Sequence, residues 1–215
     1  MRIVIVDDHP LIRRGFQAAI SVREEYEVVS MVGTVNEGRQ AISEHRPELA
    51  VVDLGLPDGN GIELISHVKH HVPETKVLVS SMRDERVFAT RCIKEGASGF
   101  IPKEGSDTEL IQAIEQIAGG GVYLSDRVTQ VDDEDVAEAF PPPFSSLRSL
   151  SARELLVFEM IGSGISTTSI ADRLSIRPKT VDSYRERIKG KLRLENMTDL
   201  LRHATRWTIF LEQGE

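Results

Sequence analysis

Short apolar runs alternate with amphipathic stretches along the first 118 residues. The apolar runs are rich in Ile and Val, which is typical of buried strands, and the stretches between them place apolar residues at helical spacing. The predicted strands are residues 2–6, 27–32, 50–52, 76–80 and 98–101, and the predicted helices are residues 11–21, 35–44, 61–71, 85–95 and 107–118. Five strands alternating with five helices predict an α/β domain whose parallel sheet is covered on both faces. At this length the flavodoxin-like strand order 2-1-3-4-5 is expected.

The pattern changes after residue 118. Three glycines at 119–121 end the last predicted helix, and an acidic run at 131–135 and three prolines at 141–143 follow, a composition that indicates a linker. From Leu150 onward no strand pattern remains, and the predicted helices are residues 151–161, 168–174, 178–192 and 198–212. Ser151 and Glu154 have capping-box spacing, and Pro178 suits a first helical turn. We expect a first domain at 1–121, a linker at 122–147 and a small all-α domain at 148–215.

Composition and charge support two domains with different partners. The chain has 215 residues, 40% of them hydrophobic, and a net charge of −8. Residues 1–140 hold 14 basic and 25 acidic side chains, whereas residues 141–215 hold 12 and 9, so only the back half is basic. Cys92 is the only cysteine, which excludes an intramolecular disulfide framework. The apolar N-terminal run is too short for a signal peptide or membrane span, so we expect a soluble cytoplasmic protein.

Charged and hydroxyl side chains gather where the predicted strands end. Asp7 and Asp8 follow the first strand, Asp53 the third, Ser81 the fourth and Lys103 the fifth. Because the carboxyl ends of parallel strands share one edge of the sheet, these side chains should surround one crevice. Carboxylates gathered there would repel one another unless a cation joined them, and a small set of oxygen ligands suits Mg²⁺. An oxygen of Asp53 can then attack phosphorus, while Mg²⁺ and Lys103 offset the charge of the phosphoryl oxygens.

These residues resemble the receiver domain of two-component response regulators. The matching stretches are Val6-Asp7-Asp8-His9-Pro10, Asp53-Leu54-Gly55-Leu56-Pro57-Asp58-Gly59-Asn60-Gly61, Ser80-Ser81-Met82 and Gly96-Ala97-Ser98-Gly99-Phe100-Ile101-Pro102-Lys103. The resemblance covers residues 1–120 and implies Asp53 as the phospho-acceptor. It also implies that Asp8, Asp53 and the Gly55 backbone carbonyl bind Mg²⁺ directly. Asp7 would lie beside these ligands without binding the ion itself. Ser81 and Phe100 would be the pair that repacks on activation, and Phe100 lacks the hydroxyl of the tyrosine often found there.

Residues 148–211 resemble the NarL/FixJ (LuxR-type) output domain, a helix-turn-helix that binds duplex DNA. The matching stretches are residues 150–155, 164–174 and 178–185, with Ile188, Lys191 and Leu192. Arg193 departs from the pattern, because glycine is usual there; we expect it to add a phosphate contact or to alter the turn before the last helix.

The 178–192 helix has an apolar stripe and a polar face. Val181, Tyr184, Ile188 and Leu192 form the stripe, and the polar face fits the major groove. The residues predicted to bind DNA are Lys179, Thr180, Asp182, Ser183, Arg185, Glu186, Arg187 and Lys191. We expect Asp182, Ser183 and Glu186 at base edges, where a carboxylate can accept from cytosine N4. The basic residues should meet phosphates, which position the protein without specifying sequence.

The sequence thus predicts a DNA-binding transcriptional regulator controlled by phosphorylation of Asp53 by a sensor histidine kinase. No enzyme activity is expected beyond the receiver's own phosphoryl transfer and slow autodephosphorylation. Two alternatives stay open. A phosphatase with an aspartyl-phosphate intermediate usually carries a second Asp two residues after the nucleophile, where this chain has Gly55. A regulator that works without phosphorylation would not need the intact set of Asp53, Ser81 and Lys103.

Three further expectations concern surfaces. Phosphorylation should produce a homodimer on DNA, with the last helix as a candidate pairing surface through Leu200, Leu201, Ala204 and Ile209, although core packing explains some of those residues. The acidic run at 132–135 could compete with DNA phosphates for Lys179 and Arg187 in the resting state. Three histidines at 67, 70 and 71 share one helix face at a spacing that can hold a metal, but a solvated face is expected because no Cys or carboxylate partner is evident nearby.

Overall fold

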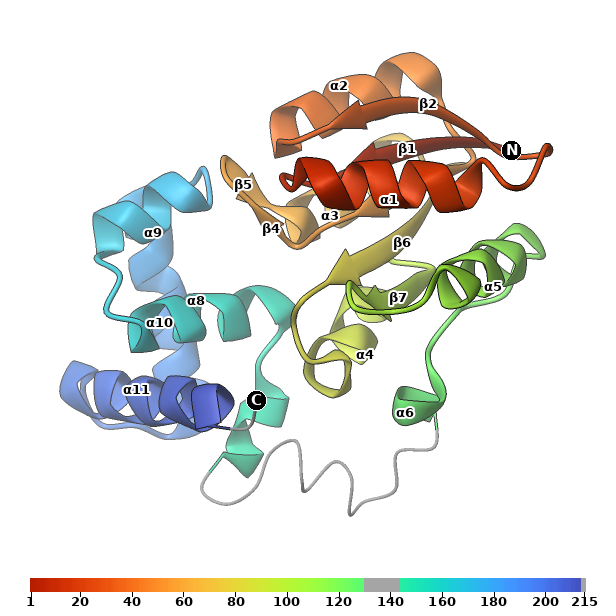
Figure 1. The fold of residues 1–215 in the computed structure, drawn as a ribbon. Coiled ribbons are helices and arrows are strands. Elements are labelled where there is room, and N and C mark those ends of the chain that lie inside the picture. Colours follow the sequence, from red (N-terminus) through yellow and green to blue (C-terminus); the bar gives the residue numbers. More distant parts are fainter. Residues whose placement is uncertain (130–143, 214–215) are drawn as a thin grey trace. The chain divides into compact units, whose positions relative to one another are not determined.

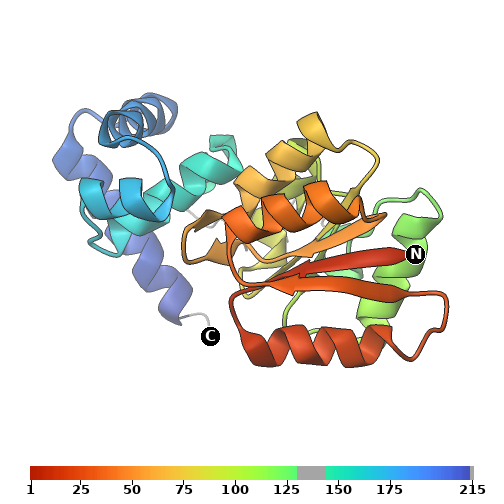
Figure 2. The same ribbon diagram turned by 90° about the horizontal axis from the view of Figure 1, so that it is seen from above.

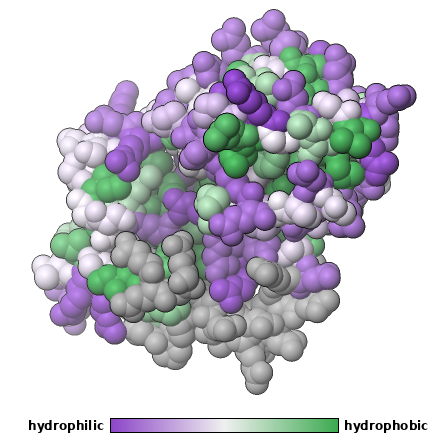
Figure 3. Space-filling model, viewed as in Figure 1, coloured by the Kyte–Doolittle hydropathy of each residue, from purple (hydrophilic) through white to green (hydrophobic). Residues whose placement is uncertain are grey.

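The computed structural model describes residues 1–129 and 144–213 and divides into two compact units, Met1–Val131 and Asp132–Glu215 (Figure 1). The acidic run at 132–135 lies outside the described residues. On the face drawn in Figure 3, hydrophobic residues form separate patches among hydrophilic ones. No helix within residues 1–129 and 144–213 combines the length and apolar character needed to cross a membrane.

A five-stranded parallel sheet forms the centre of the first unit. Its strands are β1 (Arg2–Val6), β2 (Glu27–Val32), β3 (Leu49–Val52), β6 (Lys76–Ser81) and β7 (Gly99–Pro102). Their order is β2-β1-β3-β6-β7, which confirms the predicted order 2-1-3-4-5 for the five parallel strands. Every residue of β3 is buried between its neighbours β1 and β6, because a parallel sheet with helices on both faces has no solvent side.

Five helices cover this sheet. They are α1 (Pro10–Ile20), α2 (Val35–His45), α3 (Gly61–His71), α4 (Glu85–Glu95) and α5 (Asp107–Ala118). Helices α1 and α5 lie on one face and α2 and α3 on the other, with α4 next to α3 (Figure 2). Side-chain oxygens of Thr34, Asn60, Asp84 and Ser106 cap the first turns of α2 to α5 in that order. The caps fix where each helix begins and therefore where the preceding loop, at the functional edge of the sheet, ends.

Some elements have no counterpart in the sequence pattern. A short hairpin joins β4 (Gly55–Leu56) to β5 (Gly59–Asn60) directly after β3. Two pieces of the segment 122–147, which was expected to be linker, are structured. Tyr123 pairs with Gly99 and is followed by α6 (Asp126–Thr129) in the first unit, and the 3-10 helix η1 (Ser145–Ser149) opens the described part of the second.

The second unit is built from helices joined by short turns, with no strand among its described residues. It contains α8 (Ala152–Gly162), α9 (Thr167–Arg173), α10 (Pro178–Leu192) and α11 (Met197–Gln213). The predicted capping box is confirmed, since the Ser151 hydroxyl accepts from the Glu154 N–H and the Glu154 carboxylate accepts from the Ser151 N–H. Phe158 of α8, Ile188 of α10 and Trp207 of α11 are fully buried, so their apolar faces share one core.

Candidate phosphorylation site and DNA interface

The carboxyl edge of the sheet brings together side chains from four strands. Asp7 follows β1 and Asp53 follows β3, and both carboxylates are buried, at 1% and 5% exposure. Ser81 is the last residue of β6, and Lys103 comes directly after β7. The structure thus places the predicted residues Asp7, Asp53, Ser81 and Lys103 on one edge, because the parallel strands all end there.

Lys103 is the cation that faces the two buried carboxylates. Its Nζ lies 2.7 Å from Asp53 Oδ2 and 2.8 Å from Asp7 Oδ2. Burial raises the pKa of Asp53 above its ordinary value, against the hydrogen bond and charge of Lys103, which lower it. Burial lowers the pKa of Lys103, but its bonds to Asp53 and Asp7 outweigh burial and hold that pKa above its ordinary value. The site therefore holds more negative than positive charge, which favours a further cation.

Asp8 and His9 complete the acidic cluster. The His9 Nδ1 atom lies 2.6 Å from Asp8 Oδ1 and 3.2 Å from Asp7 Oδ1, and the His9 N–H donates to Asp7 Oδ1 over 2.7 Å. One ligand atom each from Asp7, Asp8, His9 and Asp53 lies within 4.8 Å of the others. Sequence reasoning gave His9 no role. The signal available was its position directly after the acid pair and before the helix-starting Pro10.

The loop after Asp53 leaves no room for a side chain at Gly61. The Gly61 N–H donates to the Leu54 carbonyl, and a Cβ at Gly61 would lie 2.0 Å from the Asp53 carbonyl oxygen. The Gly55 backbone N–H donates to the Asp53 carboxylate and lowers its pKa. At the tip of the hairpin, the Asp58 carboxylate accepts from the first two backbone N–H groups of α2, at 2.6 and 3.0 Å. Because both ends and the tip are fixed, this loop holds Asp53 and Gly55 in place.

The expected switch residues lie on neighbouring strands. Ser81 is 2% exposed and Phe100 is fully buried. Strands β6 and β7 pair with Val79 opposite Phe100 and Ser81 opposite Pro102. The Ser81 hydroxyl accepts from the Arg83 N–H over 3.2 Å. A side-chain change at either position must therefore displace packed neighbours.

In the second unit, α9 and α10 form a helix-turn-helix. Val181, Ile188 and Leu192 of the predicted stripe are buried on one side of α10, whereas Tyr184 is half-buried. Lys179, Asp182, Ser183, Glu186 and Arg187 are exposed on this helix, and Thr180 is half-buried. The Arg187 guanidinium lies 5.1 Å from the centre of the Tyr184 ring. A polar surface on α10 thus remains for an external partner.

Two other predicted DNA contacts are engaged within the protein. The Arg185 side chain is 20% exposed, and its Nη1 donates to the Thr167 hydroxyl in the first turn of α9. The Lys191 Nζ lies 2.5 Å from Oε2 of Glu154, whose side chain is only 4% exposed. Arg185 thereby ties α10 to α9, and Lys191 ties α10 to α8, so both have structural partners that the sequence did not suggest.

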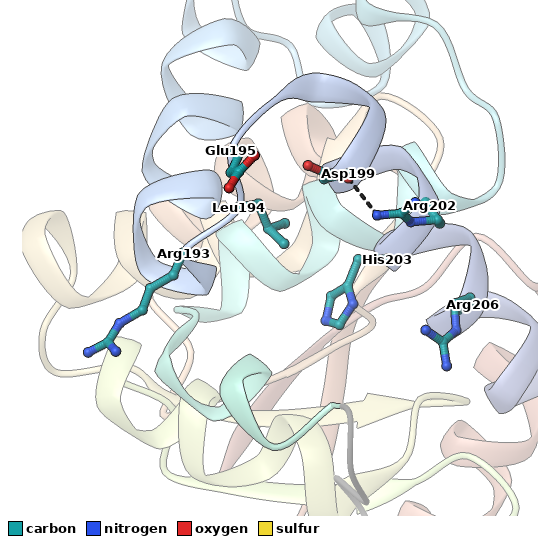
Figure 4. A pocket seen from close by; sticks show the side chains of 7 residues that line it. All are labelled: Arg193, Leu194, Glu195, Asp199, Arg202, His203 and Arg206. Atoms are coloured by element: carbon teal, nitrogen blue, oxygen red, sulfur yellow. Dashed lines mark hydrogen bonds and ion pairs between the residues drawn. The ribbon is translucent and has the colours of Figure 1, made fainter.

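Arg193 occupies the left-handed region at the end of α10, with φ 55° and ψ 42°. Glycine reaches this conformation without steric cost, which is the physical reason for glycine at such a position. Arg193 lies at the rim of a pocket of about 450 Å³ between the end of α10 and α11, and its side chain extends away from His203 and Arg206 (Figure 4). Arg193 thus keeps the left-handed turn that glycine would adopt, so the expected alteration of the turn is not seen, and the expected phosphate contact stays a prediction.

The last helix has fewer free apolar residues than expected for a pairing surface. Leu200 and Ala204 are fully buried in the core of their own unit, whereas Leu201 and Ile209 are 47% and 44% exposed. Core packing against α8 therefore accounts for Leu200 and Ala204, and only Leu201 and Ile209 of the four remain for the predicted pairing surface. Met197, at 38% exposure, is a further exposed apolar residue on this helix.

The histidines on α3 do not form a cluster of three or more metal ligands in the described part of the chain. Nδ1 of His70 contacts the Ser66 carbonyl and Nδ1 of His71 the His67 carbonyl, each one turn back. The rings of His67 and His71 stack with centres 4.4 Å apart. Ring stacking and backbone contacts therefore account for this face.

Two families match the two units. Residues 3–115 match the Response regulator receiver domain, and residues 148–204 match the Bacterial regulatory proteins, luxR family. The chain therefore belongs to the two-component response regulators that join a receiver to a LuxR-type helix-turn-helix domain. This confirms the resemblance that its sequence motifs indicated.

The similarity to particular regulators extends over nearly the whole chain. Oxygen regulatory protein NreC of Staphylococcus epidermidis is 32% identical over 95% of this chain and 96% of its own length, and NreC of Staphylococcus aureus is 30% identical over the same shares. A two-component response regulator of the LuxR family from Aurantimonas is 34% identical, covers 64% of this chain and 96% of its own, and has a TM-score of 0.58. RcsB of Salmonella enterica serovar Typhimurium, solved with promoter DNA and the phosphomimetic BeF₃⁻, covers 96% of this chain and 98% of its own at TM-score 0.72. At 24% identity, RcsB shows the fold alone.

Proposed function

We propose that a sensor histidine kinase phosphorylates Asp53 and that this phosphorylation controls DNA binding by α10. The observation that carries the proposal is the Asp53 carboxylate, held at the carboxyl edge of the sheet with the Lys103 Nζ 2.7 Å away. A buried carboxylate beside a fixed cation is a nucleophile whose charged product is stabilised in advance.

The proposed reaction transfers a phosphoryl group from a phosphohistidine of the kinase. An oxygen of Asp53 attacks phosphorus, an O–P bond forms and the P–N bond breaks. The electron pair of the broken bond stays on the imidazole nitrogen, which remains with the kinase. Lys103 stays protonated and contacts the negatively charged phosphoryl oxygens. Its positive charge offsets theirs, and no proton is transferred from it. The other ring nitrogen of the phosphohistidine carries a proton, so neutral imidazole leaves and no second acid is needed from this chain.

The residues present fit a Mg²⁺ ion. Lys103 contacts the two buried carboxylates, and the exposed Asp8 lies in the same cluster, so the site carries excess negative charge. Asp8, Asp53 and the Gly55 carbonyl would hold the ion as oxygen ligands, with Asp7 in an outer position. When bound, Mg²⁺ supplies neutralising charge to the phosphoryl oxygens. Asp7 is engaged by Lys103 and by the His9 N–H, which supports its outer role.

DNA recognition is assigned to the first turns of α10. Lys179, Asp182, Ser183 and Glu186 are exposed there, and a recognition helix presents its N-terminal residues to base edges. Lys179 and Arg187 would contact phosphates, whereas Arg185 and Lys191 act first as structural ties. Dimerisation on DNA would use the exposed residues Leu201 and Ile209 of α11.

Labelling and DNA binding by one variant test the proposal. Asp53→Asn should abolish labelling by radioactive acetyl phosphate with Mg²⁺, because an amide oxygen is a poor nucleophile. It should also abolish the gain in promoter affinity that acetyl phosphate gives to the wild type. The matched control is Asp107→Asn, an exposed carboxylate in the first turn of α5, which should behave as wild type. Undiminished labelling of Asp53→Asn would reject Asp53 as the acceptor.

A further inference from the structure

The chain after α5 returns to the sheet and lies along β7. Tyr123 and Gly99 form a parallel bridge, in which the Tyr123 N–H donates to the Ser98 carbonyl over 3.0 Å. The Phe100 N–H donates to the Tyr123 carbonyl over 3.1 Å. Strand β7 is at the edge of the sheet, so these bonds satisfy backbone groups that an edge strand leaves unpaired.

The Tyr123 side chain reinforces this pairing. It packs against the buried cluster formed by the sheet, α1 and α5. A Cβ added to Gly99 would lie 3.1 Å from the Tyr123 Cβ, so glycine at 99 permits the close approach of the two backbones. The first anchor of the returning chain is therefore attached directly to the backbone of Phe100, the expected switch residue.

A second anchor joins the same segment to α4. The Ser125 hydroxyl donates to Glu85 Oε2 over 2.7 Å, and Glu85 is only 6% exposed at the start of α4. A buried carboxylate is costly unless it accepts hydrogen bonds, so this contact holds α4 and the segment together. Helix α6, which starts at the next residue, packs against α4 (Figure 1).

Both anchors attach to the elements that carry the expected switch. Phe100 lies in β7, and Glu85 opens α4 four residues after Ser81. We propose that residues 122–129 are a coupling segment, which Tyr123 and the Ser125–Glu85 hydrogen bond hold on β7 and α4 at rest and which passes a change at Ser81 and Phe100 into the linker. The inference rests on the proposed phosphorylation of Asp53 and names the regulation of that site.

The two anchors differ in strength. Tyr123 is held by two backbone hydrogen bonds and by packing, whereas one side-chain bond connects Ser125 to Glu85. Movement of the loop between Ser81 and α4 displaces Glu85 first. Loss of the Ser125–Glu85 bond should therefore mark activation, while Tyr123 keeps the segment attached to the sheet.

Hydrogen exchange and DNA affinity of the full-length protein test the coupling. Beryllofluoride with Mg²⁺ should speed exchange of residues 122–129 in the wild type. Ser125→Ala should show fast exchange there without beryllofluoride, and the ratio of promoter affinities with and without beryllofluoride should fall by about fivefold or more. Ser125→Thr keeps the hydroxyl and should keep the wild-type ratio. The matched control is Ser21→Ala, which removes an exposed hydroxyl bond at the end of α1.

The outcomes separate the coupling from the proposed function. If beryllofluoride leaves the DNA affinity of the wild type unchanged, the proposed function is refuted, and the coupling is refuted with it. If beryllofluoride changes the DNA affinity of the wild type and of Ser125→Ala by the same ratio, the coupling alone is refuted. Faster exchange of 122–129 in Ser125→Ala with an unchanged affinity ratio would overturn it too, because the segment would then move without consequence for DNA.

Discussion

Replacing Lys191 with methionine should destabilise the DNA-binding unit, although a lysine on a recognition helix is usually assigned to phosphate binding. Methionine keeps an unbranched apolar stem and removes the ammonium group. That group lies 2.5 Å from Oε2 of Glu154, which also accepts from the Ser151 N–H at 2.8 Å. Since the Glu154 side chain is 4% exposed, the variant leaves a buried carboxylate without its counter-charge.

The magnitude lies between two limits. Breaking a buried ion pair costs about 3–5 kcal/mol, whereas exposed pairs are worth about 0–1 kcal/mol. The Lys191 side chain is 40% exposed, and Glu154 keeps its bond to Ser151, so we expect a loss of about 2 kcal/mol in the free energy of unfolding. In a small domain this lowers Tm by about 10 °C.

The loss should depend on pH. Burial raises the pKa of Glu154, but hydrogen bonds from Lys191 and Ser151 outweigh burial and hold it below the ordinary value. A carboxyl with a lowered native pKa contributes stability above its unfolded pKa and loses it as pH falls through the native pKa. The difference between wild type and Lys191→Met should therefore be full at pH 7 and shrink as pH falls below the ordinary range for glutamate.

Urea unfolding followed by tryptophan fluorescence measures this effect in the full-length protein. Trp207 is the only tryptophan and is fully buried in the second unit, so its emission reports that unit alone. Lys189→Met is the matched control, because Lys189 pairs with the exposed Glu186 three residues earlier on the same helix, and it should cost under about 0.5 kcal/mol. Equal losses for Lys191→Met and Lys189→Met at pH 7, or a loss that is the same at pH 4, would refute the structural role.

Three further outcomes follow from single positions. Arg193→Gly should raise the free energy of unfolding by about 0.5–1 kcal/mol, because φ 55° is left-handed; a lower urea midpoint by Trp207 emission would contradict this. Gly61→Ala should lower the free energy of unfolding by more than about 3 kcal/mol and weaken beryllofluoride binding measured by calorimetry, since its Cβ would lie 2.0 Å from the Asp53 carbonyl oxygen. An unchanged stability would show that the loop can move to accept a side chain at little cost. Cys92 is fully buried, and burial raises the pKa of its thiol to about 12. At pH 8 it should react with a thiol reagent only as the first unit unfolds, and rapid labelling of the native protein would contradict that.

The sequence alone determined the sheet and most of its functional edge. Strands buried on both faces must be apolar along their whole length, so the runs ending at Val6 and Val52 could be placed without any contact information. Asp7, Asp53 and Lys103 could be brought together for the same reason, because a strand end in a parallel sheet fixes the edge on which the next residue lies. Helix starts followed from capping chemistry, as at Ser151, which depends on neighbours only three residues away.

Only the tertiary structure decided which polar and charged side chains contact other elements of the same protein. Lys191 and Glu154 are 37 residues apart, and Ser125 and Glu85 are 40 apart. A local pattern shows that such side chains are polar, but it does not show which other element meets them. The same limit applies to Leu200, whose burial depends on α8, and to Tyr123, whose pairing with β7 depends on a free sheet edge. Periodicity encodes the direction a side chain faces, whereas its partner is set by the packing of distant segments, which local spacing does not record.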